Sequence, residues 1–563
     1  MGLCLATQQE WTAAARDAAA GRWPSALRQP GAYLGIVQHD DGTVRVAGDR
    51  AGTVPLYWRT VGKAVLWATA ATPLAAYTDR APAPAALLAP LAVRGLDAST
   101  HSLFPGIHRV PPGRCLILTP GRPPHTEPVP AADAELTFTD GAEQLNTALT
   151  DAVVRRTRRF DPLSADLSGG IDSSTLTVLA ARTAPHPILA TTYTDPDLDR
   201  QDDLDHARRI AAAVPGIDHR VVRGGHGVLH FSGLDDPATL PHTDLPALTL
   251  GLLAIKDAQL APALAAGSAA HLTGRGGDDV LDAPAAAALD LHLAGHPAQA
   301  LRHLAALART WRIPAHRVLR QAATTLRTPY PRALAELAAH LRGPAPIDAA
   351  LRAHLPLSWC STLPGAAWLT PTGRTALADL VADHADTAQA GTAPGRHAQR
   401  TALEMMGAGH AEYAEIARQR WNLDIHAPYL DTPVVDACHA VPAWQRRRPG
   451  DLKPLARAAF TGTVPDTVLH RRTKTAFTSS LYAGIRANAP TLHRILETSQ
   501  LTAAGLLDAD RARAALAAAV RGETVPLHGL HTLIATELWL AALPPRTHWW
   551  ESTDQPARQE AHA

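Results

Sequence analysis

The sequence predicts an α/β protein, in which a doubly wound parallel sheet continues into a largely helical C-terminal part and follows a smaller α+β unit. Two patterns support this fold class. Short apolar strands at residues 163–167, 188–193 and 271–273 alternate with Ala- and Leu-rich helical segments, as expected of parallel strands joined by crossover helices. Strand-like segments also crowd into the first 125 residues, and from about residue 285 onward the chain reads as mostly helical.

The N-terminal unit contains five strand-like segments, at residues 31–37, 43–46, 54–58, 64–68 and 114–118. The first two flank His39-Asp40-Asp41-Gly42, which is a strong signal for a β-hairpin. The Pro-rich stretch 120–130 follows the last strand. We therefore expect an N-terminal domain over residues 1–125.

A second domain is expected over residues 135–550. Its alternating strands and helices give way to helices that a Pro- and Gly-rich stretch, residues 343–395, interrupts. The last segment, residues 551–563, is polar, and we expect it to form a tail outside the folded domains.

Composition argues against several classes of function. The 563 residues carry a formal net charge of +1, whereas general nucleic-acid binding depends on positive charge. The apolar runs are short and lie between polar residues, so no membrane span is expected. The N-terminus lacks a secretory pattern, and the four cysteines lie far apart without metal-ligand spacing. These features predict a cytoplasmic protein with reduced thiols.

One stretch of ten residues, Ala165 to Ser174, indicates a phosphate site. An apolar strand ends in a Ser-Gly-Gly turn that leads directly into a helix, so free backbone N–H groups and the positive end of the helix dipole meet at one point. The two glycines let the backbone approach the anion, and Ser168 and Ser173 offer hydroxyl donors. Asp172 supplies a carboxylate where a phosphate-bound metal would lie.

This SGGxDS loop resembles the pyrophosphate-binding loop of ATP pyrophosphatases, and three further motifs narrow the resemblance. They are residues 271–279, residues 424–431, and residues 453–457 followed by Arg471-Arg472-Thr473-Lys474-Thr475. In this order, from about residue 140 to 545, the four motifs resemble the synthetase domain of the asparagine synthetase B superfamily. Residues 49–57 resemble its glutaminase domain, so the N-terminal unit is expected to be a truncated Ntn-hydrolase-like domain.

The resemblance implies that the chain binds ATP and Mg²⁺. The expected ATP-binding residues are Leu167, Ser168, Gly169, Gly170, Asp172, Ser173, Thr192 and Gly274. Asp172 and Asp278 match the metal ligands of the family, since Mg²⁺ prefers a few carboxylates together with substrate oxygens. Asp279 is expected to cap a helix. Adenine would lie against the strand ends near Leu167 and Thr192.

The resemblance also assigns three basic residues to the reaction. Lys474 lies at the motif lysine and is expected to contact both the α-phosphate and the developing oxyanion. Lys453 is either a phosphate contact or a helix-capping charge. Arg275 is expected to meet the substrate carboxylate.

A mild general base is needed as well, because an α-amine is already partly neutral at physiological pH. Glu412 falls where the β-lactam branch of the superfamily keeps its catalytic glutamate, so it is the candidate base. The alternatives are Glu415, one turn away, or an ordinary exposed helix residue at position 412. His426 and Asp431 are expected to brace the fold.

One departure from the family pattern bears on the reaction. A working glutaminase domain begins, after Met removal, with a cysteine whose own amine acts as base, but position 2 here is Gly2 and Cys4 has no free amine beside it. Without ammonia from glutamine, the nucleophile is expected to be an amine on a substrate. That places the chain among the ring-closing members, which are β-lactam synthetases, carbapenam synthetases and lasso-peptide cyclases.

Among these, the chain most resembles a lasso-peptide cyclase, a macrolactam synthetase. The short N-terminal domain and the segment with Trp359-Cys360 and residues 366–370 suit that branch, and Arg275 stands where the β-lactam branch carries tyrosine. The implied reaction adenylates an Asp or Glu side chain of a precursor core peptide, which the N-terminal α-amine of that peptide then attacks. A leader peptidase and a precursor-recognition protein are the expected partners.

Other functions stay open on the sequence alone. A β-lactam or carbapenam synthetase acting on a small amino acid is the main alternative, and a glutamine- or ammonia-dependent asparagine synthetase is another. A tRNA-modifying ATP pyrophosphatase is disfavoured, because such a protein would usually show a basic face or catalytic cysteines. Retention of Asp172, Asp278 and Lys474 argues against a non-catalytic scaffold.

Overall fold

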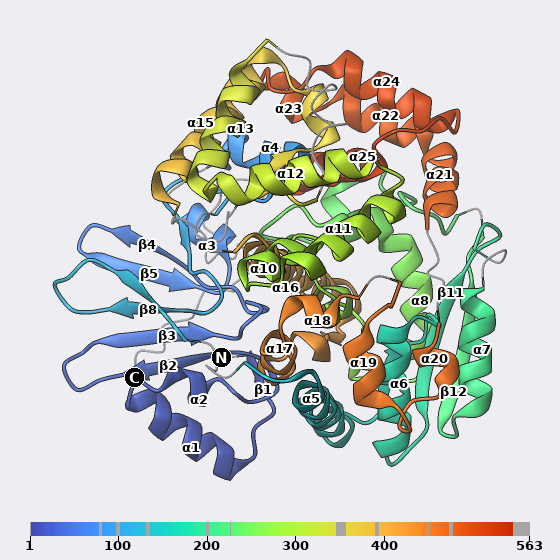
Figure 1. Ribbon diagram of the computed structural model, residues 1–563. Coiled ribbons are helices and arrows are strands. Elements are labelled where there is room, and N and C mark those ends of the chain that lie inside the picture. Colours follow the sequence, from blue (N-terminus) through green and yellow to red (C-terminus); the bar gives the residue numbers. More distant parts are fainter. Residues whose placement is uncertain are drawn as a thin grey trace, which may run out of the picture.

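The computed structural model describes residues 2–77, 81–96, 102–130, 135–198, 202–225, 227–344, 356–388, 393–448, 450–471 and 477–543. In Figure 1 the N-terminal strands lie at the left, the parallel sheet at the lower right, and a layer of helices covers the top. Lys474 and the tail 551–563 lie outside the described residues.

The N-terminal unit holds two antiparallel sheets. One has the order β1-β2-β3-β8-β9, with strands Gly2–Cys4, Gly31–Gln38, Val44–Gly48, Arg114–Leu118 and His125–Pro128. The other has the order β5-β4-β7, with strands Ala64–Ala68, Tyr57–Val61 and His108–Arg109. Helices α1 (Gln8–Ala19) and α2 (Trp23–Ala26) precede β2. Strand β9 carries the unit beyond residue 125, the end expected from the sequence.

The parallel sheet has the order β12-β11-β10-β13-β15. Its strands are Ile217–Arg223, Ile188–Thr194, Leu163–Asp166, Ala270–Leu272 and Asp424–His426, all parallel. The crossover helices are α6 (Ile171–Thr183), α7 (Asp203–Ala213) and α8 (Leu253–Ala265), and α5 (Phe138–Arg159) leads into the sheet. The predicted α/β fold with a parallel sheet is thereby confirmed.

The strand order fixes where a ligand can bind. From β10 the chain continues to β11 and β12 on one side, whereas from β13 it continues to β15 on the other. Strands β10 and β13 are hydrogen-bonded neighbours, so the order reverses between them. In open α/β sheets, ligands bind beyond the carboxyl ends of the strands at such a switch point.

The helical part contains α10 (Ala287–Leu293), α11 (Pro297–Trp311), α12 (Ala315–Arg327), α13 (Tyr330–Arg342), α15 (Pro371–Thr387), α16 (Pro394–Trp421) and α25 (Leu527–Ala542). Helix α15 forms inside residues 343–395, the Pro- and Gly-rich stretch that was expected to interrupt the helices. Pro371 occupies its first position and Thr370 caps it by accepting a hydrogen bond from the Gly373 backbone N–H (3.0 Å). Proline in this place starts a helix rather than ending one.

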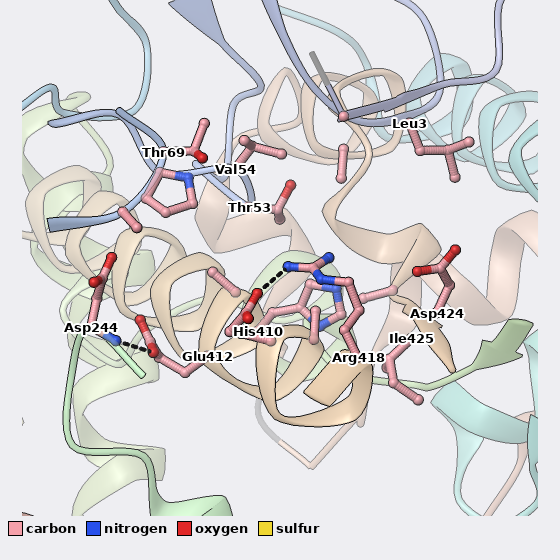
Figure 2. Close-up of a pocket in the computed structure, with 18 of the residues that line it drawn as sticks. Leu3, Thr53, Val54, Thr69, Asp244, His410, Glu412, Arg418, Asp424 and Ile425 are labelled. Carbon is pink, nitrogen blue, oxygen red and sulfur yellow. Dashed lines mark hydrogen bonds and ion pairs between the residues drawn. The ribbon is translucent and has the colours of Figure 1, made fainter. Parts of the chain in front are cut away.

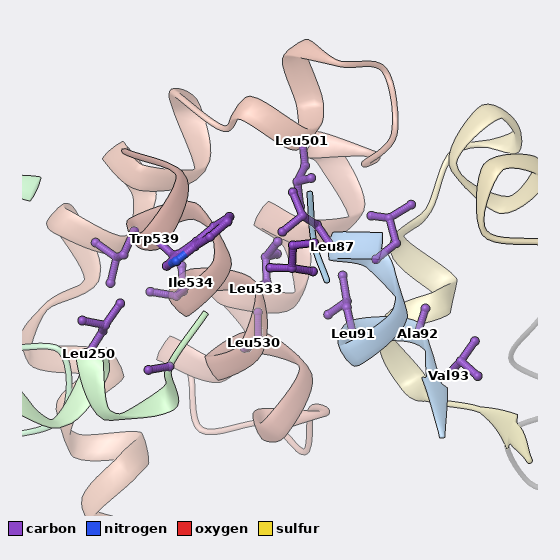
Figure 3. Packing of buried hydrophobic residues seen from close by; sticks show 14 of the residues in the cluster. Leu87, Leu91, Ala92, Val93, Leu250, Leu501, Leu530, Leu533, Ile534 and Trp539 are labelled. Carbon is purple, nitrogen blue, oxygen red and sulfur yellow. The ribbon is translucent and has the colours of Figure 1, made fainter. Parts of the chain in front are cut away.

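One N-terminal helix belongs to this helical core. Leu87 and Leu91 of α4 (Pro84–Ala92) pack among Leu530, Leu533 and Ile534 of α25, as Figure 3 shows. The following strand β6 (Val93–Arg94) pairs with β14 (Ser361–Thr362). The segment 84–94 therefore joins the two halves of the chain and is not part of the N-terminal sheets.

One segment, Leu248–Ala265, is long and apolar enough to span a membrane by length and composition alone, with a mean hydropathy of 1.3. It includes α8, and Asp257 within it pairs with Arg420 of α16 (2.7 Å) and accepts a hydrogen bond from the Trp421 indole N–H (2.8 Å). These contacts hold the segment within the folded chain.

Candidate active site

The first glycine loop follows β10 and opens helix α6. Gly169 has φ +77°, and a Cβ there would lie 2.4 Å from the Asp203 carbonyl oxygen, so the position requires glycine. Ser173 Oγ accepts a hydrogen bond from the Ser168 backbone N–H (3.1 Å) and lies 2.8 Å from Ser168 Oγ. Gly170 is the N-cap and supplies no side-chain cap. The helix therefore keeps N–H groups for an anion, as the sequence predicts.

The second glycine loop follows β13 and presses against the first. A Cβ on Gly274 would lie 2.7 Å from the Ser173 nitrogen, and one on Gly277 would lie 2.5 Å from Asp172 Cγ. The Tyr429 hydroxyl donates a hydrogen bond to the Asp172 carbonyl oxygen (3.1 Å). This contact brings the motif at residues 424–431 to the two glycine loops. Three of the four sequence motifs thus meet at the switch point.

Lys453 brings the fourth motif to this point. Its ammonium lies 2.5 Å from each Asp172 carboxylate oxygen and 2.8 Å from Asp278. Burial alone would lower the pKa of Lys453, but the two carboxylates outweigh burial and raise it. The residue is the N-cap of α19 (Pro454–Phe460) with a left-handed φ of +49°. The ammonium is therefore fixed and fully charged at neutral pH.

The same geometry bears on the predicted metal site. No group of three or more His, Cys, Asp or Glu side chains gathers around one point in the described part of the chain. Asp172 and Asp278 nevertheless converge on one cation, the Lys453 ammonium. Since Mg²⁺ is usually held by one or two carboxylates and completed by phosphate oxygens and water, this pair fits it.

Asp279 differs from its expected role as a helix cap. The N-cap of α9 (Gly277–Leu281) is Gly276, and Asp279 lies within the first turn. Burial, with a contribution from the neighbouring Asp278 carboxylate, raises the pKa of Asp279 to about 6.

The expected adenine contacts also come together. Thr192 Oγ1 donates a hydrogen bond to the Leu167 carbonyl oxygen and lies 2.8 Å from His219 Nε2. Both residues stand at carboxyl ends of neighbouring strands.

A buried cluster behind the second loop was not anticipated from the sequence. Arg275 lies over the Tyr413 ring, with its guanidinium carbon 5.3 Å from the ring centre, and Lys256 lies 5.6 Å from the same centre. Gln259 links the Lys256 ammonium (2.8 Å) to the Asp166 carboxylate (2.7 Å). Two features of the sequence could have indicated this cluster. They are a single lysine within an apolar helix and an acidic residue within an apolar strand. The cluster holds Arg275 against helix α16. Arg275 has no ion pair among the described residues.

Glu412 also lies on α16, but its carboxylate contacts a different segment of the chain from the glycine loops. Its carboxylate accepts a hydrogen bond from the Asp244 backbone N–H (2.9 Å), and burial together with the Asp244 carboxylate raises the pKa of Glu412 well above 4.5. Figure 2 shows it on the wall of a cavity of about 690 Å³ between α16 and the N-terminal unit. Residues of the glycine loops do not line this cavity within the described chain. Position 412 is buried, which argues against an ordinary exposed glutamate.

Glu415, the alternative base, is already engaged. Its carboxylate pairs with Arg418 (2.7 Å) and accepts a hydrogen bond from the Gln419 amide (2.8 Å). These bonds outweigh the effect of burial and lower the pKa of Glu415.

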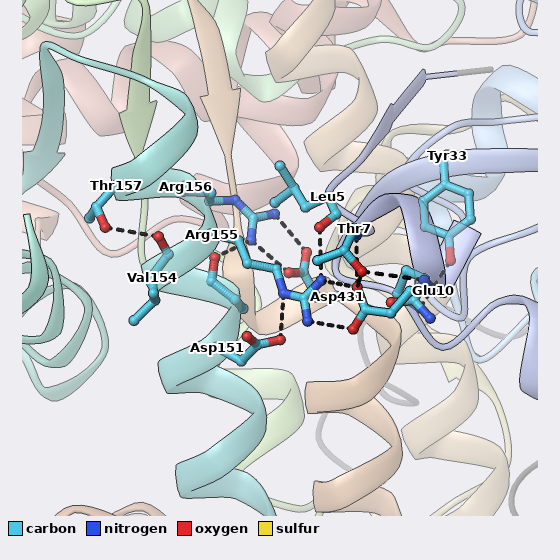
Figure 4. A network of polar contacts seen from close by, with 12 residues as sticks. Leu5, Thr7, Glu10, Tyr33, Asp151, Val154, Arg155, Arg156, Thr157 and Asp431 are labelled. Atoms are coloured by element: carbon cyan, nitrogen blue, oxygen red, sulfur yellow. Dashed lines mark hydrogen bonds and ion pairs between the residues drawn. The ribbon is translucent and has the colours of Figure 1, made fainter. Parts of the chain in front are cut away.

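A buried ion pair joins helix α5 to the motif at residues 424–431. Arg156 donates to both Asp431 oxygens (2.7 and 2.8 Å) and to His426 Nδ1 (3.3 Å), and all three residues are buried. This is the structural role expected for His426 and Asp431. The adjacent Arg155 donates to Glu10 (2.6 and 2.8 Å) and to the Leu5 carbonyl oxygen (2.9 Å), which ties α5 to the N-terminal unit (Figure 4).

Comparison with known proteins places these features in one family. No curated protein matches the chain. The model of the asparagine synthase family matches residues 144–541, which contain both glycine loops, Lys453 and helix α16. The chain therefore belongs to the asparagine synthase family, whose members are ATP-dependent amide-forming ligases.

Proposed function

We propose that the chain is a lasso-peptide cyclase, a cytoplasmic ligase that closes a macrolactam ring in a precursor core peptide. In the first step, an Asp or Glu carboxylate oxygen of the peptide attacks the α-phosphorus of ATP, the bond to the bridging oxygen breaks, and pyrophosphate leaves. In the second, the peptide's N-terminal amine attacks the acyl carbon, the C–N bond forms, AMP leaves, and the amine proton passes to a base.

The state of the cysteines carries this proposal. All four are described, and each thiol is free. Burial raises the pKa of the Cys4 thiol, and it raises the pKa of Cys115 to about 11 and of Cys360 and Cys438 to about 12. A catalytic cysteine needs an accessible thiolate, which none of the four provides at neutral pH. The absence of an activated thiol supports a nitrogen that arrives on the substrate and not from glutamine.

The N-terminal strand supports the same conclusion. Gly2 has φ +93°, and a Cβ there would lie 2.4 Å from the Ala32 carbonyl oxygen. The pairing of β1 with β2 therefore leaves no room for a side chain at position 2.

The residues of the site take distinct parts in this proposal. The N–H groups at the start of α6, with Ser168 and Ser173, would bind the phosphates, and the Lys453 ammonium would neutralise charge on the departing pyrophosphate. Asp172 and Asp278 would hold Mg²⁺, which when bound neutralises phosphate charge. Lys474 and Arg275 keep the roles given above, and Glu412 takes the amine proton.

A β-lactam or carbapenam synthetase is the second candidate, and one contact favours it. Tyr413 lies against Arg275, so a tyrosine stands beside the loop in which that branch carries one. An asparagine synthetase has no comparable support.

The test uses the purified chain with ATP, Mg²⁺ and candidate precursor peptides, together with a leader peptidase and a precursor-recognition protein. A product lighter than the peptide by one water, formed with AMP, is expected. Turnover of a small amino acid without any peptide would favour the second candidate instead.

A further inference from the structure

Helices α11 and α12 lie in a part of the sequence that carries charge of one sign. Between Asp290 and Glu336 the chain has no Asp or Glu and no Lys, but it has seven arginines and four histidines. The whole chain is almost balanced, with 53 basic residues (Lys and Arg) and 52 acidic ones. This stretch is therefore strongly basic within a nearly neutral protein, and either the fold or a partner has to balance its charge.

The fold balances little of this charge. Arg332 pairs with Glu336 (3.0 Å), and the Arg327 guanidinium donates to the Ala323 carbonyl oxygen (3.1 Å). The other five arginines are exposed and form neither an ion pair nor a side-chain hydrogen bond with a described residue; they are Arg302, Arg309, Arg312, Arg317 and Arg320. Five positive charges thus stand uncompensated on α11, on α12 and on the turn between them.

The packing of the two helices turns these charges outward. The buried sides of α11 and α12 share one apolar cluster, to which they contribute Leu304, Ala308, Val318 and Ala322. Arg302 and Arg309 are seven residues apart on α11, and Arg317 and Arg320 are three apart on α12, so each pair lies on one side of its helix. Figure 1 shows both helices on the near side of the molecule, with no other element in front of them.

Exposed leucines accompany the arginines. Leu301 and Leu319 directly precede Arg302 and Arg320 and are 53 % and 39 % exposed, and Leu293 of α10 is 52 % exposed. Three of the nine large apolar side chains that are exposed in the described chain therefore lie on α10, α11 and α12. Arginine without lysine, next to exposed apolar side chains, is the composition of a protein–protein interface.

Two other anionic partners fit this surface less well. A helix that lies on a membrane needs a continuous apolar face to insert into lipid, but the apolar faces of α11 and α12 are already buried in their shared cluster. A nucleic acid would bring phosphates to the arginines and leave the leucines facing sugar and phosphate. Carboxylates pair bidentately with guanidinium groups, and a protein segment can cover the leucines as well.

We propose that the outward side of α11 and α12 is a docking surface for an acidic, amphipathic segment of a partner protein. The Asp and Glu side chains of that segment pair with the five exposed arginines, and its apolar side chains cover Leu301 and Leu319. These two helices carry none of the residues assigned to ATP or to the reaction, so the inference does not depend on the proposed function.

The experiment measures binding to the full-length chain without ATP. The probe is a fluorescent helical peptide built from Leu-Glu-Glu-Leu repeats, and fluorescence anisotropy follows its binding. We expect saturable binding that weakens as NaCl is added, because salt screens exposed charges. The same peptide with Lys in place of every Glu should not bind. No saturable binding of the glutamate peptide, or equal binding of the lysine peptide, would overturn the proposal.

Matched charge reversals test where the peptide binds. Arg317→Glu combined with Arg320→Glu should weaken binding on the order of tenfold or more, because two attractive charges become repulsive. Arg16→Glu combined with Arg122→Glu changes the net charge equally at two exposed arginines of the N-terminal unit and should leave binding unchanged. Circular dichroism checks the fold of both variants. Unchanged binding in the first variant, or an equal loss in the second, would refute the location.

The leucines have a separate test. Leu301→Ser combined with Leu319→Ser should weaken binding of the Leu-Glu-Glu-Leu peptide. It should leave unchanged the weaker binding of a peptide with Ser in place of every Leu, which has no apolar side chains to lose. An equal effect on the two peptides would remove the leucines from the docking surface.

The competing partners are titrated under the same conditions, as duplex DNA and as vesicles that contain phosphatidylglycerol. Neither should compete with the glutamate peptide at physiological ionic strength. Tighter binding of the DNA or of the vesicles than of the peptide, abolished by Arg317→Glu with Arg320→Glu, would show that the surface serves a nucleic acid or a membrane and would contradict the proposal.

Discussion

The Lys453 ammonium lies 2.5 Å from the Asp172 carboxylate, although 281 residues separate them in the chain. This contact joins the start of α6, after the first glycine loop, to the start of α19. Asp278, from the second loop, meets the same ammonium. The three residues form the charged centre of the proposed adenylation site, and several measurable consequences depend on it.

Asp172→Asn and Asp278→Asn should each reduce AMP formation by on the order of a hundredfold or more, because each removes a charge placed for the phosphates and Mg²⁺. AMP release is measured by chromatography, and circular dichroism checks the fold. Wild-type turnover in either folded variant would remove that carboxylate from the site.

Gly277→Ala should lower activity by at least roughly tenfold, the loss that a small displacement of a reacting group produces. The added Cβ would lie 2.5 Å from Asp172 Cγ and displace that carboxylate from Lys453. Gly225→Ala is the matched control, since a Cβ at Gly225 meets no atom within 4 Å. Equal initial rates of AMP release for the two variants would show that the closeness of the loops is unimportant.

Glu412→Gln should leave adenylation intact and slow ring closure, because Gln cannot accept the amine proton. ATP–pyrophosphate exchange reports the first step, and mass spectrometry of the cyclised peptide reports the second. Unchanged ring closure would exclude Glu412 as the base.

Glu412→Gln should also change how the stability of the folded chain depends on pH. Burial raises the pKa of Glu412 in the folded chain above 4.5, so the folded state binds more protons than the unfolded state. Wild-type stability therefore falls as pH rises from 4.5 toward the folded-state pKa. The melting temperature of Glu412→Gln should exceed that of the wild type increasingly over this range and match it below pH 4.5. A constant difference across pH would contradict the assignment.

Arg155→Met should loosen the N-terminal unit. Hydrogen bonds from Arg155 lower the pKa of Glu10 from 4.5 to about 2, so this contact stabilises the fold above pH 4.5 and is lost as pH falls toward 2. Both side chains are partly exposed, which limits the expected cost to about 1 kcal/mol. Limited proteolysis at neutral pH should cleave the variant faster between α1 and α5, and equal cleavage rates would argue against the contact.

The alternation of strands and helices was sufficient to predict the parallel sheet, and the residues after β10 were sufficient to predict a glycine loop that opens a helix. Both are local patterns, in which a buried strand leads into glycines and a helix start. Strand β12 escaped prediction because it is an edge strand and carries Asp218, His219 and Arg220 in its middle. The apolar helix α4 gave no sign in the sequence that it packs against α25.

Burial of charge was the hardest feature to predict. A run of like charges such as Arg446-Arg447-Arg448 is typical of a solvated surface, yet Arg446 is fully buried and donates to the Val280 and Asp282 carbonyl oxygens (2.8 and 2.6 Å). Tyr413 gave no sign that it contacts Arg275, because that contact depends on how α16 crosses the second loop. Such partners come from tertiary packing, which spacing along the chain does not encode.

The most direct test is to identify the nucleotide formed when the purified chain is given ATP, Mg²⁺ and a candidate precursor peptide with a free N-terminal amine. The account predicts AMP and pyrophosphate in equal amounts, together with a peptide lighter by one water. Formation of ADP, or failure of the chain to bind ATP, would contradict it.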